Sequence, residues 1–535
     1  MGIPSYFSYI VKNHSTIIKR LSNLGKRPHN LYLDSNSIIY DCLRRLTPEY
    51  SKYTDGEFET KLIDAMCVTI DGYIKTTNPS KTVFIAFDGV APFAKMEQQK
   101  NRRYKSALDA QIKQSLDIPS PKVWDKTAIT PGTKFMKKMG TRLNSYYKTK
   151  AQTLGVKHIM ISDSRDVGEG EHKIFGYIRD NPEKHKDETS LIYGLDADLI
   201  MLGLNHLPIS KNLYLYRETP EFIKSIDRSL EPNETYVLDL PVLAEAIISK
   251  MNNYLKANNK QQTNRLYDYI FLCFFLGNDF MPHFPAINIR TRGIDTMLTA
   301  YQNTIGKTNE NLTDGKTIYW KNVKKLVEYL AESEETMLKN EYKIRTKWAR
   351  RHYPTSSDEE KLFHFSLLPT RERTKEEMID PHSQYWQHRY YKILFDTDIN
   401  NYYKKQISIN YLEGLEWTMK YYTTGCADWK WGYQYHYPPL LNDLVKYIPQ
   451  WETQMIEENT NKAVHPYVQL SYVLPNTSLG LLPPKIRKKL RDKYGDYYHM
   501  DNEIVWSFCK YFWESHVDFD HIDFNDLEKT VLELC

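Results

Sequence analysis

Three short apolar runs, each ending at an aspartate, constrain the fold of this chain more than any other feature of its sequence. They are LYLD ending at Asp34, VFIAFD ending at Asp88 and LIYGLD ending at Asp196, and longer segments with helical patterning separate them. Strand-length runs that alternate with helices are typical of an α/β fold with a largely parallel sheet. Ligands bind beyond the carboxyl ends of such strands, so we expect the three acids to meet at one site, although each alone would also serve as a helix N-cap or turn residue.

Further carboxylates occur beside small residues and strong apolar runs. The two glutamates of GEGEHK flank a glycine in a flexible turn, and a helix is expected to begin just after them. Asp198 follows Asp196 by two positions, which in extended backbone would place both side chains on one face. Carboxylates without paired His or Cys ligands indicate Mg²⁺, with Mn²⁺ as the alternative, and two such ions would activate water for phosphodiester hydrolysis. The candidate metal ligands and catalytic acids are Asp34, Asp88, Glu169, Glu171, Asp196, Asp198 and Asp279.

A basic segment follows Asp88 almost at once. The stretch from Phe93 to Lys105, FAKMEQQKNRRYK, holds five basic residues and one acid. Read as a helix, it places its cations along one face beside the carboxylates. Arginine offers a bidentate fork to phosphate and lysine a point charge, so this face predicts a pocket for a 5′ phosphate, although a basic helix is more often a solvated surface. The candidate phosphate ligands are Lys95, Gln99, Arg102 and Arg103.

The composition excludes several classes of protein. With 41% hydrophobic and 26% charged residues, the chain is neither fibrous nor disordered. Its longest apolar run, YIFLCFFL, is far shorter than the ~20 residues of a membrane helix, and the N-terminus lacks a signal-peptide layout, so we expect an intracellular protein without a membrane span. Six cysteines without a CxxC pair indicate neither a disulfide framework nor a zinc ribbon. A net charge of +5 does not by itself predict nucleic-acid binding.

A polar, charged stretch divides the chain into two blocks. It runs from about Lys339 to Lys375 and has the composition of a linker or an exposed insertion. The block that follows is dense in aromatic residues, above all between Trp417 and Tyr437. Most of these rings are expected in the core, but so dense a cluster would also expose a platform on which bases stack.

Motifs along nearly the whole chain resemble those of one family, the Xrn-type 5′→3′ exoribonucleases. The similar stretches in the first block are MGIPSYF, LYLDSNSIIY, FIAFDGVAPFAKMEQQKNRR, ITPGTKFM, SRDVGEGEHKIFGYIR, IYGLDADLIMLGL and FLGNDFMPHFP. In the second block they are YLEGLEWTMKYYTTGCADWKWGYQYHYPPLL and HPYVQLSYVLPNTSLGLLPP. Individual motifs are weak signals, whereas so many in this order carry the resemblance together.

The resemblance implies both an architecture and an activity. It implies an α/β nuclease core of the PIN-like and flap-endonuclease type over 1–345, with a projecting tower helix at about 100–130. A linker or insertion over 346–383 and a largely helical second block over 384–535, wrapped around the active site, would follow. The seven acids would bind Mg²⁺ and the four candidate phosphate ligands would hold a 5′ monophosphate. The implied reaction is processive 5′→3′ degradation of single-stranded RNA to mononucleotides, with capped and triphosphorylated ends excluded by the size of the pocket.

The resemblance also implies residues along the path of the strand. The family commonly has a histidine where this chain has Tyr40, so an aromatic face is kept but a titratable group is lost. Stacking on a terminal base should therefore persist with a changed pH dependence. The facing aromatic is expected to be Trp429, with Trp431 and Trp417 as alternatives, and Pro92 lies where the strand would separate from a duplex.

Two other functions stay open. A structure-specific flap endonuclease or DNA exonuclease would use the same acids, and a non-catalytic protein would bind RNA 5′ ends without cutting, although a binder of polyanions gains nothing from clustered carboxylates. The chain is expected to be a compact monomer without the long C-terminal extension of the large family members. We expect it to act in cytoplasmic mRNA decay, downstream of a decapping activity. A nuclear location stays open because the run KIRKKLRDK could be a nuclear signal, although a solvated helix face explains it better.

Overall fold

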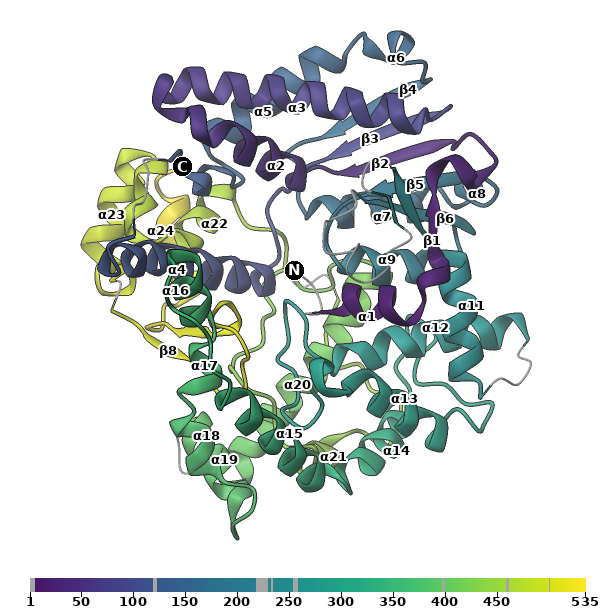
Figure 1. The fold of residues 1–535 in the computed structure, drawn as a ribbon, viewed down its shortest axis with the longest axis vertical. Helices are drawn as coiled ribbons and strands as arrows, with labels where there is room; N and C mark the ends of the chain where they lie inside the picture. The colour runs from purple at the N-terminus through teal and green to yellow at the C-terminus, as the bar shows by residue number, and fades with distance from the viewer. Residues whose placement is uncertain are drawn as a thin grey trace.

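A mixed, mostly parallel seven-stranded sheet lies at the centre of the α/β part of the molecule (Figure 1). The computed structural model describes residues 5–118, 123–217, 230–231, 234–253, 258–396, 400–458, 461–499 and 501–535. The strand order is β1-β7-β6-β5-β2-β3-β4; β2 to β6 pair in parallel, and β7 pairs antiparallel with both neighbours. The strands are β1 (Ile18–Arg20), β2 (Asn30–Asp34), β3 (Thr82–Ala86), β4 (His158–Ser162), β5 (Thr189–Tyr193), β6 (Asn212–Arg217) and β7 (Tyr236–Asp239).

Helices cover both faces of this sheet, which explains why its central strands are apolar throughout. Leu31 and Leu33 of β2 point into one hydrophobic core, and Tyr32 points into the other. The first core lies under α2 (Asn36–Leu46), α3 (Asp55–Thr77) and α5 (Lys134–Tyr147), and the second lies under α7 (Gly170–Asp180) and α9 (Asp198–His206), as Figure 1 shows. The α/β fold expected from the three strand-length runs is thus confirmed.

The remainder of the chain is largely helical, as expected. Its helices extend the second core away from the sheet and pack their apolar faces around buried residues such as Trp320 and Trp417. These helices are α1 (Tyr6–Asn13), α11 (Leu240–Met251), α12 (Asn259–Phe274), α13 (Gly293–Thr304), α14 (Trp320–Ala331), α15 (Glu334–Ala349), α20 (Asn401–Thr423) and α21 (Leu441–Tyr447). The C-terminal helices α22 (Pro466–Val473), α23 (Pro484–Tyr494) and α24 (Phe524–Leu532), with the hairpin β8 (Glu503–Val505) and β9 (His516–Asp518), form a further unit.

Helix α4 (Phe93–Ser115) joins this C-terminal unit to the sheet (Figure 1). Pro92 caps its first turn, and Met96 packs into the core formed by α22, α23 and α24. Helix α4 begins at Phe93, where the basic stretch was read as a helix, because Pro92 fixes an extended backbone at its N-cap. The placement of a projecting tower helix at about 100–130 stays a prediction. Helix α4 ends at Ser115; residues 119–122 lie outside the described part, and a short 3₁₀ turn follows at Lys126–Ala128.

The segment expected to be an exposed linker is folded. It contains α16 (Asp358–Ser366), α17 (Leu368–Arg371) and α18 (Thr374–Ile379), and α19 (Trp386–Leu394) follows it. The division of the chain at 345 and 384, with a linker or insertion over 346–383 between the two blocks, stays a prediction. The charged residues of this segment include a buried pair, Arg373 and Glu376, and composition alone does not distinguish buried charges from exposed ones.

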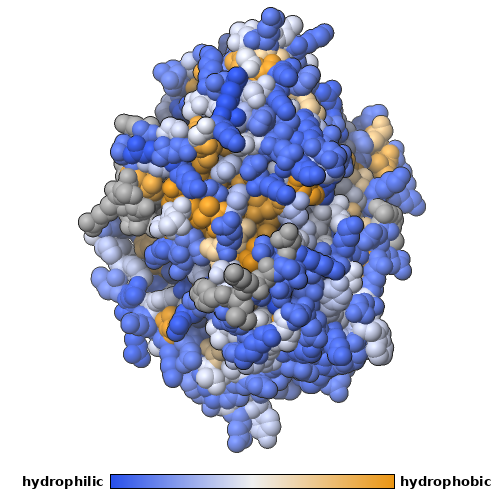
Figure 2. Space-filling model, turned by 90° about the vertical axis from the view of Figure 1, so that its right-hand side faces the viewer, coloured by the Kyte–Doolittle hydropathy of each residue, from blue (hydrophilic) through white to orange (hydrophobic). Residues whose placement is uncertain are grey.

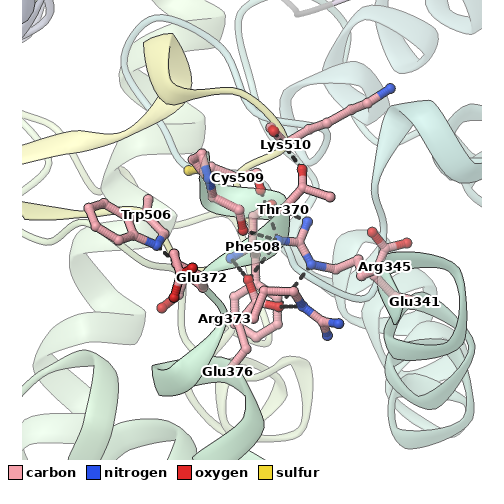
Figure 3. Close-up of polar contacts among 12 residues, drawn as sticks. Glu341, Arg345, Thr370, Glu372, Arg373, Glu376, Trp506, Phe508, Cys509 and Lys510 are labelled. Atoms are coloured by element: carbon pink, nitrogen blue, oxygen red, sulfur yellow. Dashed lines mark hydrogen bonds and ion pairs between the residues drawn. The ribbon is translucent and has the colours of Figure 1, made fainter. Parts of the chain in front are cut away.

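A buried charge network ties this segment to the C-terminal region (Figure 3). The Glu376 carboxylate accepts hydrogen bonds from Arg345 Nε at 2.9 Å and Arg345 Nη2 at 2.6 Å, from Arg373 Nε at 2.8 Å and from the Phe508 N–H at 2.8 Å. Arg345 also donates to the carbonyl oxygens of Phe508 and Cys509. Every member of the network therefore has partners, as buried charges require.

Polar residues dominate the face of the molecule in Figure 2, with hydrophobic residues gathered in a band across its upper half. The basic run KIRKKLRDK lies on α23, where Ile486 and Leu490 are buried and the cations lie on the outer face, as expected. Across the described ranges, no helix combines the length and the apolar character needed to cross a membrane. The cysteines are free thiols.

Candidate active site

Three adjacent parallel strands bring their aspartates to one edge of the sheet. Asp34 is the last residue of β2, Asp88 follows β3 by two residues, and Asp196 follows β5 by three. Because β5, β2 and β3 are neighbours, their carboxyl ends open onto the same cavity of about 510 Å³, which all three acids line. The convergence predicted from the three strand-length runs is present.

The start of α7 adds two glutamates to this cavity. Glu169 is the N-cap of α7 and Glu171 lies in its first turn, and both line the cavity. Between them, the Gly170 N–H donates to Asp88 Oδ1 at 2.8 Å. A Cβ at Gly170 would lie 2.7 Å from Asp34 Oδ1, so only glycine allows the helix to approach the strand end this closely.

The other two acids reach the site differently from the prediction. The backbone is not extended between Asp196 and Asp198, because Ala197 is already helical (φ −68°, ψ −24°) and Asp198 begins α9. The two side chains therefore do not share a strand face; instead, the Asp198 N–H donates to Asp196 Oδ1 at 3.2 Å. Asp279 lies in the loop after α12, where it accepts a hydrogen bond from Lys95 Nζ at 2.8 Å.

Crowding and burial make this cluster costly to ionise. Burial and the neighbouring Asp88 and Asp196 raise the pKa of Asp34 well above its ordinary value. Burial and repulsion from Glu169 do the same for the pKa of Glu171. The pKa of Asp198 is raised to about 8, mainly by burial and then by Asp196 and Asp279. Such a cluster calls for cations.

The donor set fits a divalent ion. Asp34, Asp88 and Glu171 each place a carboxylate oxygen within 4.8 Å of the others, and Glu169, Glu171 and His172 form a second such group. Asp34 Oδ1 and Asp198 Oδ1 are buried without a hydrogen-bond partner among the described residues. Carboxylate oxygens are the ligands that Mg²⁺ and Mn²⁺ prefer.

Helix α4 carries the predicted phosphate ligands on the face that it turns toward the cavity. Gln99, Arg102 and Arg103 all line it. Gln99 Oε1 accepts from Gln469 Nε2 at 3.1 Å, and Arg103 Nη2 donates to Thr130 Oγ1 at 2.7 Å. Arg103 Nη1 is buried without a partner within the described ranges, which leaves one donor for a ligand.

Lys95, the fourth predicted phosphate ligand, is held by the acids instead. Its ammonium pairs with Glu169 at 2.6 Å and with Asp279 at 2.8 Å. Burial alone would lower the pKa of Lys95, but these two carboxylates and Glu171 raise it well above its usual range. Lys95 therefore links the basic face of α4 to the acid cluster.

Of the candidate stacking residues, Tyr40 lines the cavity with 39% of its surface exposed. Trp417 and Trp431 are buried and stack on each other at 5.2 Å, as core residues do. Trp429 is half-buried, and its carbonyl oxygen accepts from the first N–H of α4 at 2.9 Å. Pro92 is buried at the N-cap of the same helix. The roles of all these side chains stay predictions.

Several supporting residues escaped the reading of the sequence. The side-chain amide of Asn36 donates to Asp88, and the Tyr421 hydroxyl donates to Glu169 Oε2 at 2.7 Å. His172 stacks on the Tyr421 ring at 3.7 Å. Asn36 lies within the LYLDSN motif, two residues after Asp34, so its position beside the acids was predictable from the sequence. Tyr421 comes from the distant second block, so no local signal connects it with Glu169.

Comparison with known protein families confirms the resemblance to the Xrn-type 5′→3′ exoribonucleases. The family described as "XRN 5'-3' exonuclease N-terminus" matches residues 1–219, and the "Xrn1 helical domain" matches 260–384 and 368–534.

Relatives match along the chain at 27–28% identity. A 5'-3' exoribonuclease 2 homolog of Drosophila melanogaster is 27% identical over 99% of this chain and 71% of its own length. The 5'-3' exoribonuclease 1 of Saccharomyces cerevisiae is 27% identical, and that of Homo sapiens 28%, both over 100% of this chain. This chain spans only 43% of the yeast protein and 34% of the human one. With both regions matched over most of its length, the chain belongs to the XRN 5′–3′ exoribonuclease family.

Proposed function

We propose that this protein is a divalent-metal-dependent exoribonuclease that degrades single-stranded RNA processively from a 5′ monophosphate and releases mononucleotides. The observation that carries the proposal is a single cavity lined both by the acids at the strand ends and by the basic face of α4. An RNA whose terminal phosphate lies against α4 would have its first linkage over the acids. Binding and hydrolysis would then act on the same end of the strand.

The acids would hold two Mg²⁺ ions. Asp34, Asp88 and Glu171 would bind one of them, because their oxygens are already close together. The other ligands would come from Glu169, Asp196, Asp198 and Asp279. When bound, the ions would activate water and stabilise the leaving oxygen of the linkage.

The chain's own residues would select the end of the substrate. Arg102 and Arg103 would form charge-assisted hydrogen bonds to a monophosphate, and Gln99 would contribute its amide. Tyr40 and Trp429 would stack on bases, and Pro92 would help to separate the strand from a duplex. As the family resemblance implies, the pocket around the terminal phosphate would exclude capped and triphosphorylated ends by its size.

The test is the digestion of a 3′-labelled RNA that carries a 5′ monophosphate, triphosphate or hydroxyl, with Mg²⁺ or with EDTA, beside the matching DNA. The proposal predicts rapid loss of the monophosphate RNA only, and only with Mg²⁺. Internal cuts or a preference for DNA would favour a flap nuclease instead. Tight binding without degradation would favour a protein that only binds 5′ ends.

The proposed substrate has two consequences. On a capped mRNA, the 5′ monophosphate would be generated by an upstream hydrolase that removes the cap. The proposed site draws all its groups from one chain, so we expect a monomer, which sedimentation would detect as a single species of 63.3 kDa.

A further inference from the structure

Arg217, the last residue of β6, lines the catalytic cavity without belonging to the predicted site. It lies at the carboxyl end of the strand beside β5, so it reaches the cavity from the sheet and not from α4. Its Nη2 donates to the carbonyl oxygen of Leu195, and its guanidinium lies 3.9 Å from the centroid of the Phe7 ring. Its other donors, Nε and Nη1, are buried and have no hydrogen-bond partner among the described residues.

A buried guanidinium with two unpaired donors destabilises the folded protein unless a ligand accepts hydrogen bonds from them. Burial, opposed by Asp196, lowers the pKa of Arg217 to about 10, so the group stays a cation at neutral pH. Desolvating charged donors without hydrogen bonds disfavours the folded state. An anion that enters the cavity would satisfy them, and the proposed substrate brings phosphates there.

Arg103 and Arg217 offer unused donors at two different places in the cavity. Arg103 lies on α4, where the charges of Arg102, Tyr40 and Asp125 act on it, and Arg102 and Tyr40 line the cavity with it. Arg217 lies on the sheet side, where Asp196 and Tyr193 act on it. One guanidinium therefore stands beside the candidate stacking residue and the other beside the acid cluster.

We propose that Arg217 binds the phosphate of the first internucleotide linkage, while Arg103 binds the terminal 5′ phosphate. This inference rests on the proposed function, because it places an RNA end in the cavity. The linkage to be cut must lie over the acids, and Arg217 is the arginine beside Asp196. A charge-assisted hydrogen bond from Arg217 would fix this phosphate and stabilise the charge that develops on it.

The test is a cycle of protein and RNA changes, read out by equilibrium binding in EDTA so that metal-dependent hydrolysis does not occur. The RNAs are 5′-phosphorylated decamers with a neutral methylphosphonate at the first linkage, at the third linkage or at neither. The proteins are wild type, Arg217→Gln and, as the matched control, Arg103→Gln. Repulsion between the acids and the first linkage is common to all three proteins and cancels in the comparison.

The methylphosphonate at the first linkage is expected to raise the Kd of wild type about tenfold more than it raises the Kd of Arg217→Gln. The reason is that only wild type loses a charged hydrogen bond to this linkage. Arg103→Gln should respond to the first linkage as wild type does, but should no longer distinguish a 5′ phosphate from a 5′ hydroxyl. Neutralising the third linkage should affect all three proteins alike.

Equal effects of the first linkage on wild type and on Arg217→Gln would overturn the inference and would assign Arg217 only to holding the Leu195 carbonyl. If Arg217→Gln melts at a lower temperature than wild type, Arg217→Lys keeps the charge and is expected to retain part of the coupling. A wild-type protein that shows no preference for a 5′ phosphate in any assay would contradict the proposed function itself.

Discussion

Asp34 combines burial at the end of β2 with close carboxylate neighbours, so its charge is unfavourable in the metal-free protein. We predict that Asp34→Asn lowers the rate of RNA degradation at least about a hundredfold without lowering the melting temperature in EDTA. Removal of one charge from a repulsive cluster need not destabilise the fold. Activity assays with melting curves check this, and Asp64→Asn, an exposed acid on α3, is the control. Full activity of Asp34→Asn would remove Asp34 from the site.

Lys95 occupies carboxylates that the proposed metal ions need. Because its ammonium pairs with Glu169 and Asp279, a divalent cation must compete with it. We predict that Lys95→Met binds Mn²⁺ several-fold more tightly than wild type in calorimetric titration, although it degrades RNA more slowly. Lys113→Met, on the exposed part of α4, should leave Mn²⁺ affinity unchanged. Weaker Mn²⁺ binding by Lys95→Met would show that Lys95 organises the acids instead of competing for them.

Single residues were predictable from the sequence where a local pattern marked them. Asp34, Asp88 and Asp196 each end an apolar run, and parallel strands bring such ends together. The ion pairs of Lys95 were not predictable, because spacing along α4 gives the face of a residue but not its partners. Arg217 also ends a strand-length run, NLYLYR, but an arginine at a strand end does not by itself indicate a metal site.

Helix α7 depends on the absence of a side chain at its first residue. We predict that Gly170→Ala lowers activity at least about tenfold, because its Cβ would meet Asp34 Oδ1 and push the helix away from β2. Gly176→Ala on the same helix has only ordinary contacts, the nearest atom lying at 3.7 Å, and should be neutral or stabilise by about 0.5–1 kcal/mol. Steady-state kinetics and urea unfolding of the pair check this. Equal activities would show that α7 tolerates the displacement.

The insertion between the blocks depends on Glu376 (Figure 3). Glu376→Gln removes the carboxylate that pairs with both buried cations, Arg345 and Arg373, and we predict a loss of about 3–5 kcal/mol in the free energy of unfolding. Urea unfolding is the measurement. Glu377→Gln, the exposed neighbour on α18, is the control and should change stability by less than about 0.5 kcal/mol. A stable Glu376→Gln would mean that water replaces the lost charge.

Elements were predictable when one periodicity dominated them. Strands β2, β3 and β5 and the basic helix followed from apolar runs and from cation spacing. The start of α9 was misjudged because Asp196 and Asp198 fit an extended chain equally well. The buried ion pairs of Glu376 with Arg345 and Arg373 were not predictable, because a polar composition does not distinguish buried charges from exposed ones. The pair with Arg345 joins residues far apart in the sequence, and only tertiary packing shows it.

At the scale of the molecule, the second block completes the site from a distance. Tyr421 holds Glu169, and Gln469 supports both Gln99 and the Ala91 N–H that precedes α4. The family resemblance predicted that this block wraps the site, while its exact contacts required the structure. The cavity itself is lined by residues between Ser5 and Arg217, and these contacts from the second block hold part of that lining in place. Substitutions on α4 and substitutions of the acids should therefore impair binding of the RNA end and hydrolysis separately.

The most direct test of this account compares kcat/KM for 5′-monophosphate and 5′-hydroxyl RNA of one sequence, in wild type and in Arg102→Gln. Wild type should prefer the monophosphate at least about tenfold. Arg102→Gln should lose most of this preference while cleaving the 5′-hydroxyl RNA at the wild-type rate, because the acids are untouched. An unchanged preference in Arg102→Gln, or a wild type that does not distinguish the two ends, would contradict the claim that α4 and the acid cluster act on the same end of one RNA.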